Sequence, residues 1–494
     1  MIKNEIYKKA FAALCFIVAS SLLMRFSGGY FGFVITLFGV CFALMQKPGK
    51  ALSCYAFLIM MVVTNPIIWP KDGIGWSYSL RLGPLLIGLS LIIAAARATG
   101  NLRIPLGGII PFMFVAMVSS VNGWVPKISY LKIINFLVFM IGIWLGTQNM
   151  QSKYNDLFAF RAMLLAIAAF FILGSLFLLP FPEVSYLSSL RAYAQGGAEE
   201  AAVAAQEMIK SQLAGDVNAY SALFCGITNQ AQCLAPVMVI LFSWVVCDML
   251  FIEKQIRWPH LLLMIVAIPL LYLTRSRVAL VSLLASLCMI YFYALRKIEI
   301  SRRVKQIVMH GMIVFGFLLM LGAVAAEIHS DAISRWMRKT NDVEDDDRSL
   351  TEAMTTSRMG LFEYSMYEFH RSPMIGSGFQ VSEQHLDLIH RSNGMILSAP
   401  IEKGLLPVMV LGETGIVGAI FFLFFIISFY VTATNRRLYV TITLFTIFFA
   451  TNLGEATFFS PGGNGGMLWL CAVVGGFMMD TAILGEQQRR MREW

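Results

Sequence analysis

Long apolar stretches separated by short polar segments run along almost the whole chain. Many have the length of roughly 17 to 25 residues that a helix needs to cross a bilayer. They lack the strict polar and apolar alternation of an outer-membrane barrel. The pattern therefore predicts an all-α polytopic membrane protein with about fourteen transmembrane helices. The expected spans lie near residues 10–24, 30–45, 51–68, 82–96, 104–121, 130–146, 157–179, 234–250, 261–273, 278–294, 307–326, 406–431, 438–452 and 467–484.

The composition supports the same class. Hydrophobic residues make up 58% of the chain and charged residues only 14%, and the mean hydropathy is +0.71. These values exclude a soluble domain of this length. Residues 1–494 are therefore expected to form a single polytopic membrane domain, and the first apolar run is interpreted as an uncleaved helix because no cleavage site follows it.

Lysine and arginine gather on one side of this predicted topology, as they do in cytoplasmic loops. An even number of spans returns both termini to that side, so both termini are expected to be cytoplasmic, in a bacterial inner membrane. The net charge of +9 is attributed to this asymmetry and to anionic lipid headgroups, so no nucleic-acid partner is expected. The basic residues on that side are Lys3, Lys8, Lys9, Lys47, Lys50, Arg97, Arg103, Lys153, Lys254, Arg257, Arg296, Lys297, Arg302, Arg303, Lys305, Arg436, Arg437, Arg489, Arg490 and Arg492.

Two long loops are expected on the exported, periplasmic side, at residues 180–232 and 327–405. Within the second, apolar residues repeat at helical spacing from Met359 to Phe369, which predicts a short amphipathic helix lying on the membrane. Pro373 and the glycines that follow it are expected to end this helix in a tight turn.

The sequence offers no metal-ligand spacing. Its six histidines form no His-Glu-x-x-His pattern, and no Cys-x-x-Cys pair occurs. The acidic run Glu344–Asp347 is interpreted as a solvated loop rather than a metal site. Cys225 and Cys233 lie near the exported side, where a disulfide is permitted by the compartment but disfavoured by helical geometry; the sequence leaves this open.

Several short motifs occur in a defined order along the chain. Ser357-Arg358, the segment Ser-Pro-Met-Ile-Gly-Ser-Gly-Phe at 372–379, and Leu-Gly-Glu-Thr-Gly-Ile-Val-Gly at 411–418 follow one another in the chain. Thr-Arg-Ser-Arg-Val-Ala-Leu at 274–280 and Gly-Ile-Thr-Asn-Gln-Ala-Gln-Cys-Leu at 226–234 precede them. In this order and on this side of the membrane, the set resembles the O-antigen ligase and Wzy-type O-antigen polymerase superfamily, over about residues 220–420.

The resemblance implies a fold similar to the GT-C membrane glycosyltransferases and a metal-independent transferase that needs no cofactor. The donor would be a glycan linked to undecaprenyl diphosphate at the periplasmic face, and membrane lipids surround the enzyme. The acceptor would be a lipid-linked repeat unit or lipid A core. A chain-length regulator is a further candidate partner.

The resemblance also implies roles for single residues. Arg277 and Arg358 match the family's periplasmic arginines, whose planar guanidinium groups suit a diphosphate; Arg275 and Arg191 are secondary candidates. The alternatives are snorkelling of the helix-end arginines to the interface and, for Arg358, a solvated helix face. Glu413 is a rare acid within an apolar run, which marks either function or a structural carboxylate.

The identity of the catalytic base is open. Where the ligase branch carries a periplasmic histidine, this chain has Gly404. Glu402 is the first candidate to take the acceptor proton, with Lys403 contacting phosphate, and the pair equally fits an interfacial ion pair. His390 and His385 are alternative bases.

The leading hypothesis is a glycan polymerase of the periplasmic face, which transfers undecaprenyl-diphosphate-linked oligosaccharide to a lipid-linked repeat unit in polysaccharide biosynthesis. A ligase that moves the glycan to lipid A core or to a protein is the alternative in the same class. A transporter of lipid-linked glycans or solutes is the alternative from another class, although the spans show hardly any charged residues in their middle. A purely scaffolding membrane subunit is the last alternative.

Overall fold

The computed structural model describes residues 2–27, 34–35, 37–39, 41, 48–64, 88, 104–148, 154–186, 224–228, 231–274, 276–290, 293, 298, 350–382, 405–454 and 456–493. The regular structure of these residues is helical, apart from two isolated β-bridges, and loops and turns connect the helices. In chain order the helices are α1 (Ile2–Ser27), α3 (Pro48–Val63), α5 (Ile109–Val121), α6 (Pro126–Gln148), α7 (Tyr154–Leu178), α8 (Pro182–Ser185), α11 (Ala231–Cys247), the π-helical η2 (Asp248–Glu253), α12 (Trp258–Leu273), α13 (Arg277–Met289), α17 (Leu350–Arg371), α19 (Leu406–Asn435), α20 (Tyr439–Asn452), α21 (Asn464–Trp469), the π-helical η5 (Leu470–Val474) and α22 (Gly475–Glu493).

Six of the described helices are long and apolar enough to cross a membrane, and five shorter ones are also apolar. The prediction of a helical, multi-pass membrane protein is therefore confirmed. The expected number of about fourteen spans stays a prediction, because the segments near 30–45, 82–96 and 307–326 fall largely or wholly outside the described residues.

Burial separates a central helix from peripheral ones. In the most apolar 18-residue window of Cys233–Glu253, which comprises most of α11 and all of η2, 94% of the residues are buried. In the corresponding window of Leu406–Asn435 in α19, only 28% are buried. The exposed side chains of α19 are apolar and recur every three or four residues, as in Ile416, Ile420 and Phe424. Such an apolar outer stripe is what a helix presents to lipid tails.

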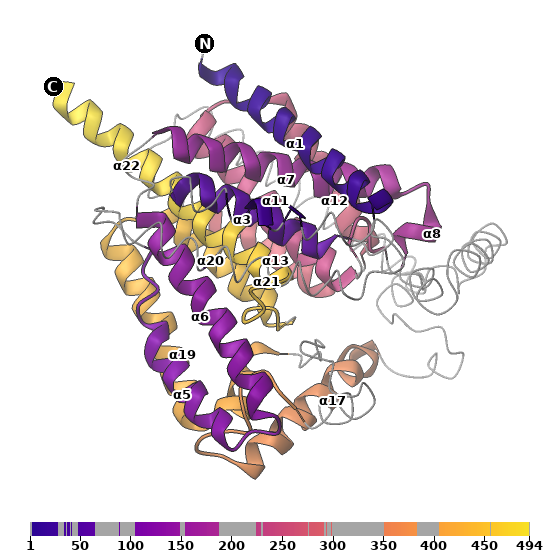
Figure 1. Cartoon of the computed structure of the whole chain (residues 1–494), viewed down its shortest axis with the longest axis vertical. Coiled ribbons are helices and arrows are strands. Elements are labelled where there is room, and N and C mark those ends of the chain that lie inside the picture. The colour runs from indigo at the N-terminus through magenta and orange to yellow at the C-terminus, as the bar shows by residue number, and fades with distance from the viewer. Residues whose placement is uncertain are drawn as a thin grey trace.

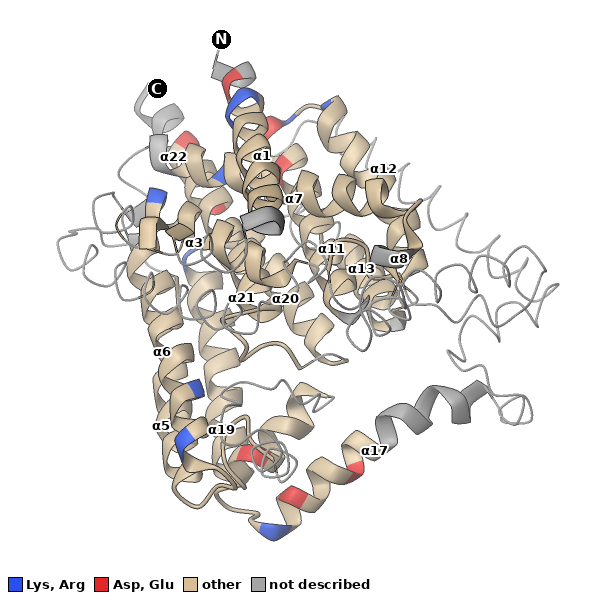
Figure 2. Ribbon diagram, turned by 45° about the vertical axis from the view of Figure 1, so that its right-hand side comes forward, with Lys and Arg blue, Asp and Glu red and all other residues tan. Residues whose placement is uncertain are grey.

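Both termini lie at one end of the molecule, and α17 lies at the other (Figure 1). Charged residues gather toward these two ends, and the ribbon between them is nearly free of charge (Figure 2). At the terminal end, Lys254 Nζ forms an ion pair of 2.6 Å with Glu486 of α22. This arrangement agrees with an even number of spans; which compartment each end faces remains a prediction.

An aromatic cluster holds α5, α19, α20 and the segment between α20 and α21 together. Phe458 stacks on Phe448 with ring centroids 5.2 Å apart, and Phe459 stacks on Phe112 at 5.4 Å. The Nε1 of Trp469 donates a 2.8 Å hydrogen bond to the Phe458 carbonyl oxygen. The segment after α20 is therefore packed inside the helices rather than over them.

Asp480 of α22 fixes the start of α20. Its carboxylate accepts hydrogen bonds from the Val440 amide at 3.0 Å and from the amide and hydroxyl of Thr441 at 2.8 and 2.7 Å. These are N–H groups of the first turn of α20, which have no partner within their own helix, and the negative charge also complements the helix dipole. Buried Asp480 therefore stabilises the first turn of α20.

Candidate functional site

The segments 372–379 and 411–418, two of the motifs that carry the resemblance, meet at the end of the molecule opposite the termini. The first follows α17, which ends at Arg371 because residue 372 precedes a proline and proline disfavours a helical residue before it. This confirms the predicted break before Pro373. The second lies within α19, and α19 is not continuous: Gly415 has φ 66° and ψ −170°, so the helix is interrupted there.

The segment after α17 supplies the hydrogen bonds that the interrupted helix lacks. The amides of Ile416 and Val417 donate to the carbonyl oxygens of Pro373 at 2.8 Å and Met374 at 3.2 Å. A break at Gly415 would otherwise leave these amides unsatisfied in apolar surroundings, which costs several kcal/mol per group. The loop therefore makes the interruption of α19 possible.

The carbonyl side of the break is satisfied in the same way. The Gly412 carbonyl oxygen accepts from the Ser377 amide, and the Glu413 carbonyl oxygen accepts from the Gly378 amide, both at 3.1 Å. Ser119 of α5 adds a 2.6 Å hydrogen bond to the same Glu413 oxygen. Donors and acceptors on both sides of the kink thus pair with the loop, which fixes the loop against α19.

Glycine is required where the two segments touch. Gly376 and Gly415 have φ of 77° and 66°, a region that other residues rarely adopt. A Cβ at position 376 would lie 2.2 Å from the Glu413 carbonyl oxygen, and one at position 415 would lie 2.4 Å from backbone atoms of Met374. The glycines of both motifs are therefore explained by one close approach of two backbones.

Two serines lock the end of the loop to the α5–α6 hairpin. The hydroxyls of Ser120 and Ser129 are 2.6 Å apart. Ser129 donates to the Phe379 carbonyl oxygen at 2.6 Å, and the Phe379 amide donates to Ser120 at 3.3 Å. The Phe379 ring enters the aromatic cluster, 5.1 Å from that of Phe459. The end of the loop therefore contacts α5, α6 and the segment between α20 and α21.

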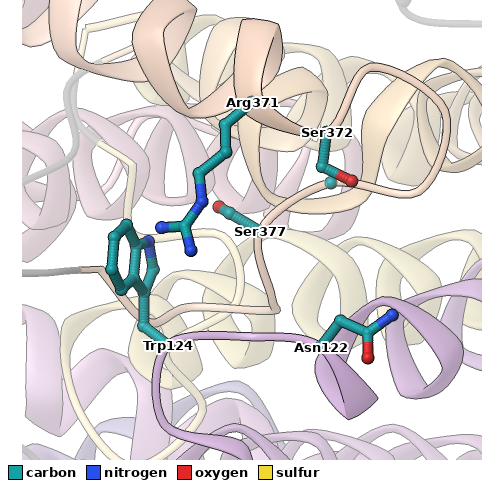
Figure 3. Close-up of a pocket in the computed structure, with 6 residues that line it drawn as sticks. Asn122, Trp124, Arg371, Ser372 and Ser377 are labelled. Carbon is teal, nitrogen blue, oxygen red and sulfur yellow. The ribbon is translucent and has the colours of Figure 1, made fainter.

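A small pocket opens beside this junction, with a volume of about 210 Å³. The guanidinium of Arg371, the last residue of α17, lies over the indole of Trp124, with its Cζ 3.7 Å from the ring centroid (Figure 3). Both Arg371 and Asn122 are exposed. The pocket is lined by Asn122, Trp124, Arg371, Ser372, Gly376 and Ser377. It therefore combines one cation with side-chain amide and hydroxyl groups.

Glu413 is the only predicted site residue whose side chain the structure describes. It is 1% exposed and lies two residues before the break in α19. The burial is consistent with both interpretations of this acid, functional and structural. The remaining predicted site residues for which nothing is described are Glu402, Lys403, Arg275, Arg191, His390 and His385.

The backbones of the two main arginines are described, and their side chains are not. Arg277 is the first residue of α13, whose N-cap Ser276 accepts a 3.3 Å hydrogen bond from the Ala279 amide. α12 ends at Leu273 and α13 begins at Arg277, close to the span limits of 273 and 278 that the sequence predicted. Arg358 lies within α17, which contains the segment Met359–Phe369 that was predicted to be helical.

The apolar stripe expected along α17 is not its buried face. Phe362 of that stripe is 41% exposed, whereas Ser365 and Glu368 are 2% and 1% exposed. A Cβ at Gly412 of α19 would lie 2.7 Å from the Ser365 carbonyl oxygen. The helix therefore packs on α19 through small and polar groups, which leaves Phe362 for other contacts.

The segment between α20 and α21 was not predicted as part of the site. A Cβ at Gly454 would lie 2.2 Å from the side chain of Val278, so this segment touches the start of α13 at one end and, through Phe459, the Phe379 loop at the other. Its sequence signal was the glycine cluster at 462–466, next to Phe458 and Phe459.

A buried charge cluster at the terminal end was also missed. The guanidinium of Arg161 pairs with both carboxylate oxygens of Asp248, at 2.7 and 2.8 Å, and with Glu253. His260 Nε2 lies 2.8 Å from Asp248, and Arg257 pairs with Glu253 at 3.2 Å. The charges of Arg161, Asp248 and Glu253 lie near the ends of their spans rather than in the middle. They are buried because they pair with one another.

Cys225 and Cys233 are not joined by a disulfide. Within the described ranges, no group of three or more histidine, cysteine, aspartate or glutamate residues is arranged to hold a metal ion.

Known proteins give no identification. Neither the protein-family models nor the curated proteins yielded a match to this chain. The inference about function therefore depends on the motifs and on the geometry of the junction between α17, α19 and the α5–α6 hairpin.

Proposed function

We propose that the chain is a glycan polymerase that acts at the periplasmic face of a bacterial inner membrane and extends a glycan carried on undecaprenyl diphosphate. The observation that supports this most is the pairing of segments 372–379 and 411–418 around the break at Gly415. Two weak motifs that carry the resemblance form one rigid unit beside a cationic pocket, so they act as parts of a single site.

In the proposed reaction, an acceptor hydroxyl attacks the anomeric carbon of the donor sugar. The new glycosidic bond forms as the bond to the diphosphate breaks, and the hydroxyl proton passes to Glu402. The leaving diphosphate is held by Arg277 and Arg358, whose forked donors suit phosphate oxygens. Glu413, buried beside the kink, has a positioning role.

The proposal is tested with the purified full chain in liposomes that contain a lipid-linked oligosaccharide. We expect longer products and released undecaprenyl diphosphate, and we expect Arg277→Ala and Arg358→Ala each to remove them while protein level and insertion stay normal. Normal chain lengths in both variants would refute the assignment of the diphosphate to these arginines. Transfer to lipid A core instead of to a second lipid-linked unit would identify the ligase alternative.

A transporter is the second candidate, and one observation favours it. Interrupted membrane helices such as α19, with a buried acid next to the break, are typical of transporter substrate sites. In the same liposomes, a transporter would move the lipid-linked glycan between leaflets without forming a glycosidic bond. The two candidates therefore give different products from one experiment.

A further inference from the structure

The pocket beside Trp124 contains the cation Arg371, for which the described residues supply no counter-ion. Arg371 forms no ion pair or hydrogen bond with any residue in the described part of the chain. Its guanidinium instead lies over the indole of Trp124, with Cζ 3.7 Å from the ring centroid (Figure 3). Stacking of this kind occupies the face of the guanidinium and leaves its N–H edge free to donate two parallel hydrogen bonds.

Trp124 serves as a platform rather than as a hydrogen-bond donor. Its Nε1 is buried and has no acceptor among the described residues. A buried N–H without an acceptor destabilises the fold. The position of the Trp124 indole therefore lowers stability. The arrangement orients the long side chain of Arg371.

The size and lining of the pocket indicate what it accepts. A volume of about 210 Å³ is below the roughly 300 to 1,000 Å³ of sites that enclose a drug-sized ligand. One charged group with part of its sugar fits this space, and an oligosaccharide does not. The side chains of Ser372, Ser377 and Asn122 supply further hydrogen-bonding groups around the free edge of Arg371.

The pocket is separate from the proposed diphosphate site. Positions 358 and 371 are thirteen residues apart on α17, which corresponds to roughly 20 Å along the axis and about 3.6 turns. The two positions therefore face nearly opposite sides of the helix. A diphosphate held at position 358 leaves the Arg371 pocket for another part of the substrate.

We propose that the Arg371–Trp124 pocket binds one oxyanion, a carboxylate or a phosphate, carried by a sugar unit of the glycan. This inference rests on the proposed function for the nature of the substrate, and it adds that the preferred repeat unit is acidic. The bidentate edge of a guanidinium matches the two oxygens of a carboxylate or of a phosphate. Neutral sugars lack the charge that would pair with Arg371.

The test is binding of simple probes to the full chain in nanodiscs, measured by calorimetry or by ligand-observed NMR, with sodium glucuronate, inorganic phosphate and glucose. We expect both anions to bind more tightly than glucose, and the stronger of the two identifies the source of the oxyanion. Arg371→Ala is expected to weaken anion binding by at least about ten-fold. Arg371→Lys should weaken it similarly, because lysine keeps the charge but not the flat fork.

Lys127→Ala is the matched control, because Lys127 is an exposed cation of the first turn of α6 that does not line the pocket. Its anion binding should equal that of the unmodified protein. Undetectable anion binding, equal binding of glucose and glucuronate, or unchanged binding in Arg371→Ala overturns the proposal. Full rescue by Arg371→Lys also overturns it, since a role limited to the charge at the end of α17 would then suffice.

Elongation of lipid-linked oligosaccharide, measured in parallel, separates this inference from the proposed function. If the protein binds anions through Arg371 but elongates nothing, the pocket stands and the polymerase assignment fails. If the unmodified protein elongates glycans, and the Arg371→Ala variant still binds anions and elongates acidic units normally, the polymerase assignment is supported. The proposed oxyanion site at Arg371 is then refuted.

Discussion

The amide of Ile416 donates a 2.8 Å hydrogen bond to the carbonyl oxygen of Pro373, 43 positions earlier in the chain. In an uninterrupted helix this amide would bond to the carbonyl oxygen of Gly412. The Gly412 oxygen accepts instead from the Ser377 amide. The loop after α17 and the kink in α19 have therefore exchanged backbone partners, and each requires the other.

The first prediction concerns the glycines at this junction. Gly376→Ala and Gly415→Ala should each lower the free energy of unfolding by more than about 2 kcal/mol, because each combines positive φ with a backbone clash. Thermal unfolding of the purified protein in detergent measures this. Gly360→Ala in α17 is the control: a Cβ there meets no atom within 4 Å, so stability should be unchanged or rise by up to about 1 kcal/mol.

The second prediction concerns Asp480. Asp480→Ala removes three hydrogen bonds to the start of α20 and should destabilise the protein by roughly 2 to 3 kcal/mol, since bonds to a charged group contribute more than neutral ones. Asp480→Asn should cost less because one acceptor remains. Glu486→Ala, which breaks an exposed ion pair, should cost under about 1 kcal/mol. An equal loss in both alanine variants would contradict the capping role.

The third prediction concerns the buried charge cluster. Arg161→Met leaves the carboxylates of Asp248 and Glu253 without their shared cation and should cost roughly 3 to 5 kcal/mol. Adding Asp248→Asn to that variant should recover part of the loss, because it removes a buried charge that has lost its arginine partner. A double-mutant cycle measures this coupling. Strictly additive effects of the two changes would show that the contact does not stabilise the fold.

The fourth prediction concerns the catalytic base of the proposed reaction. Glu402→Gln keeps the side-chain volume and removes the proton acceptor, so the initial rate of elongation should fall by about 10² to 10⁴-fold. Lys403→Met, which removes the neighbouring charge, should affect substrate binding more than the maximal rate. Unchanged turnover in Glu402→Gln would move the assignment to His390, to be tested with His390→Ala.

Part of the fold followed from the sequence because it is local. Apolar length predicted the helices that became α6, α7, α11 and α19, since a helix in lipid satisfies its own backbone. The end of α17 before Pro373 followed from the geometry of proline, and the turn before α13 from the polar residues between two apolar runs. The glycines of segment 372–379 correctly indicated a tight turn.

Other parts depended on contacts between distant segments. The sequence marked Gly415 as part of a motif, but a helix interruption needs external partners, and those come from the loop after Pro373. Arg371 and Trp124 are far apart in the chain, so their stacking was not predictable from spacing. Arg161 and Asp248 each look like isolated charges near span ends until the fold pairs them.

The sequence alone determined that this protein is a bundle of membrane helices and which short segments are polar enough for chemistry, because hydrophobic length and local turn preference are properties of neighbouring residues. Only the tertiary structure decided which of those segments share a site. The physical reason is that a helix break inside a membrane protein is tolerated only where another segment supplies the missing hydrogen bonds. That partner can lie anywhere else in the chain.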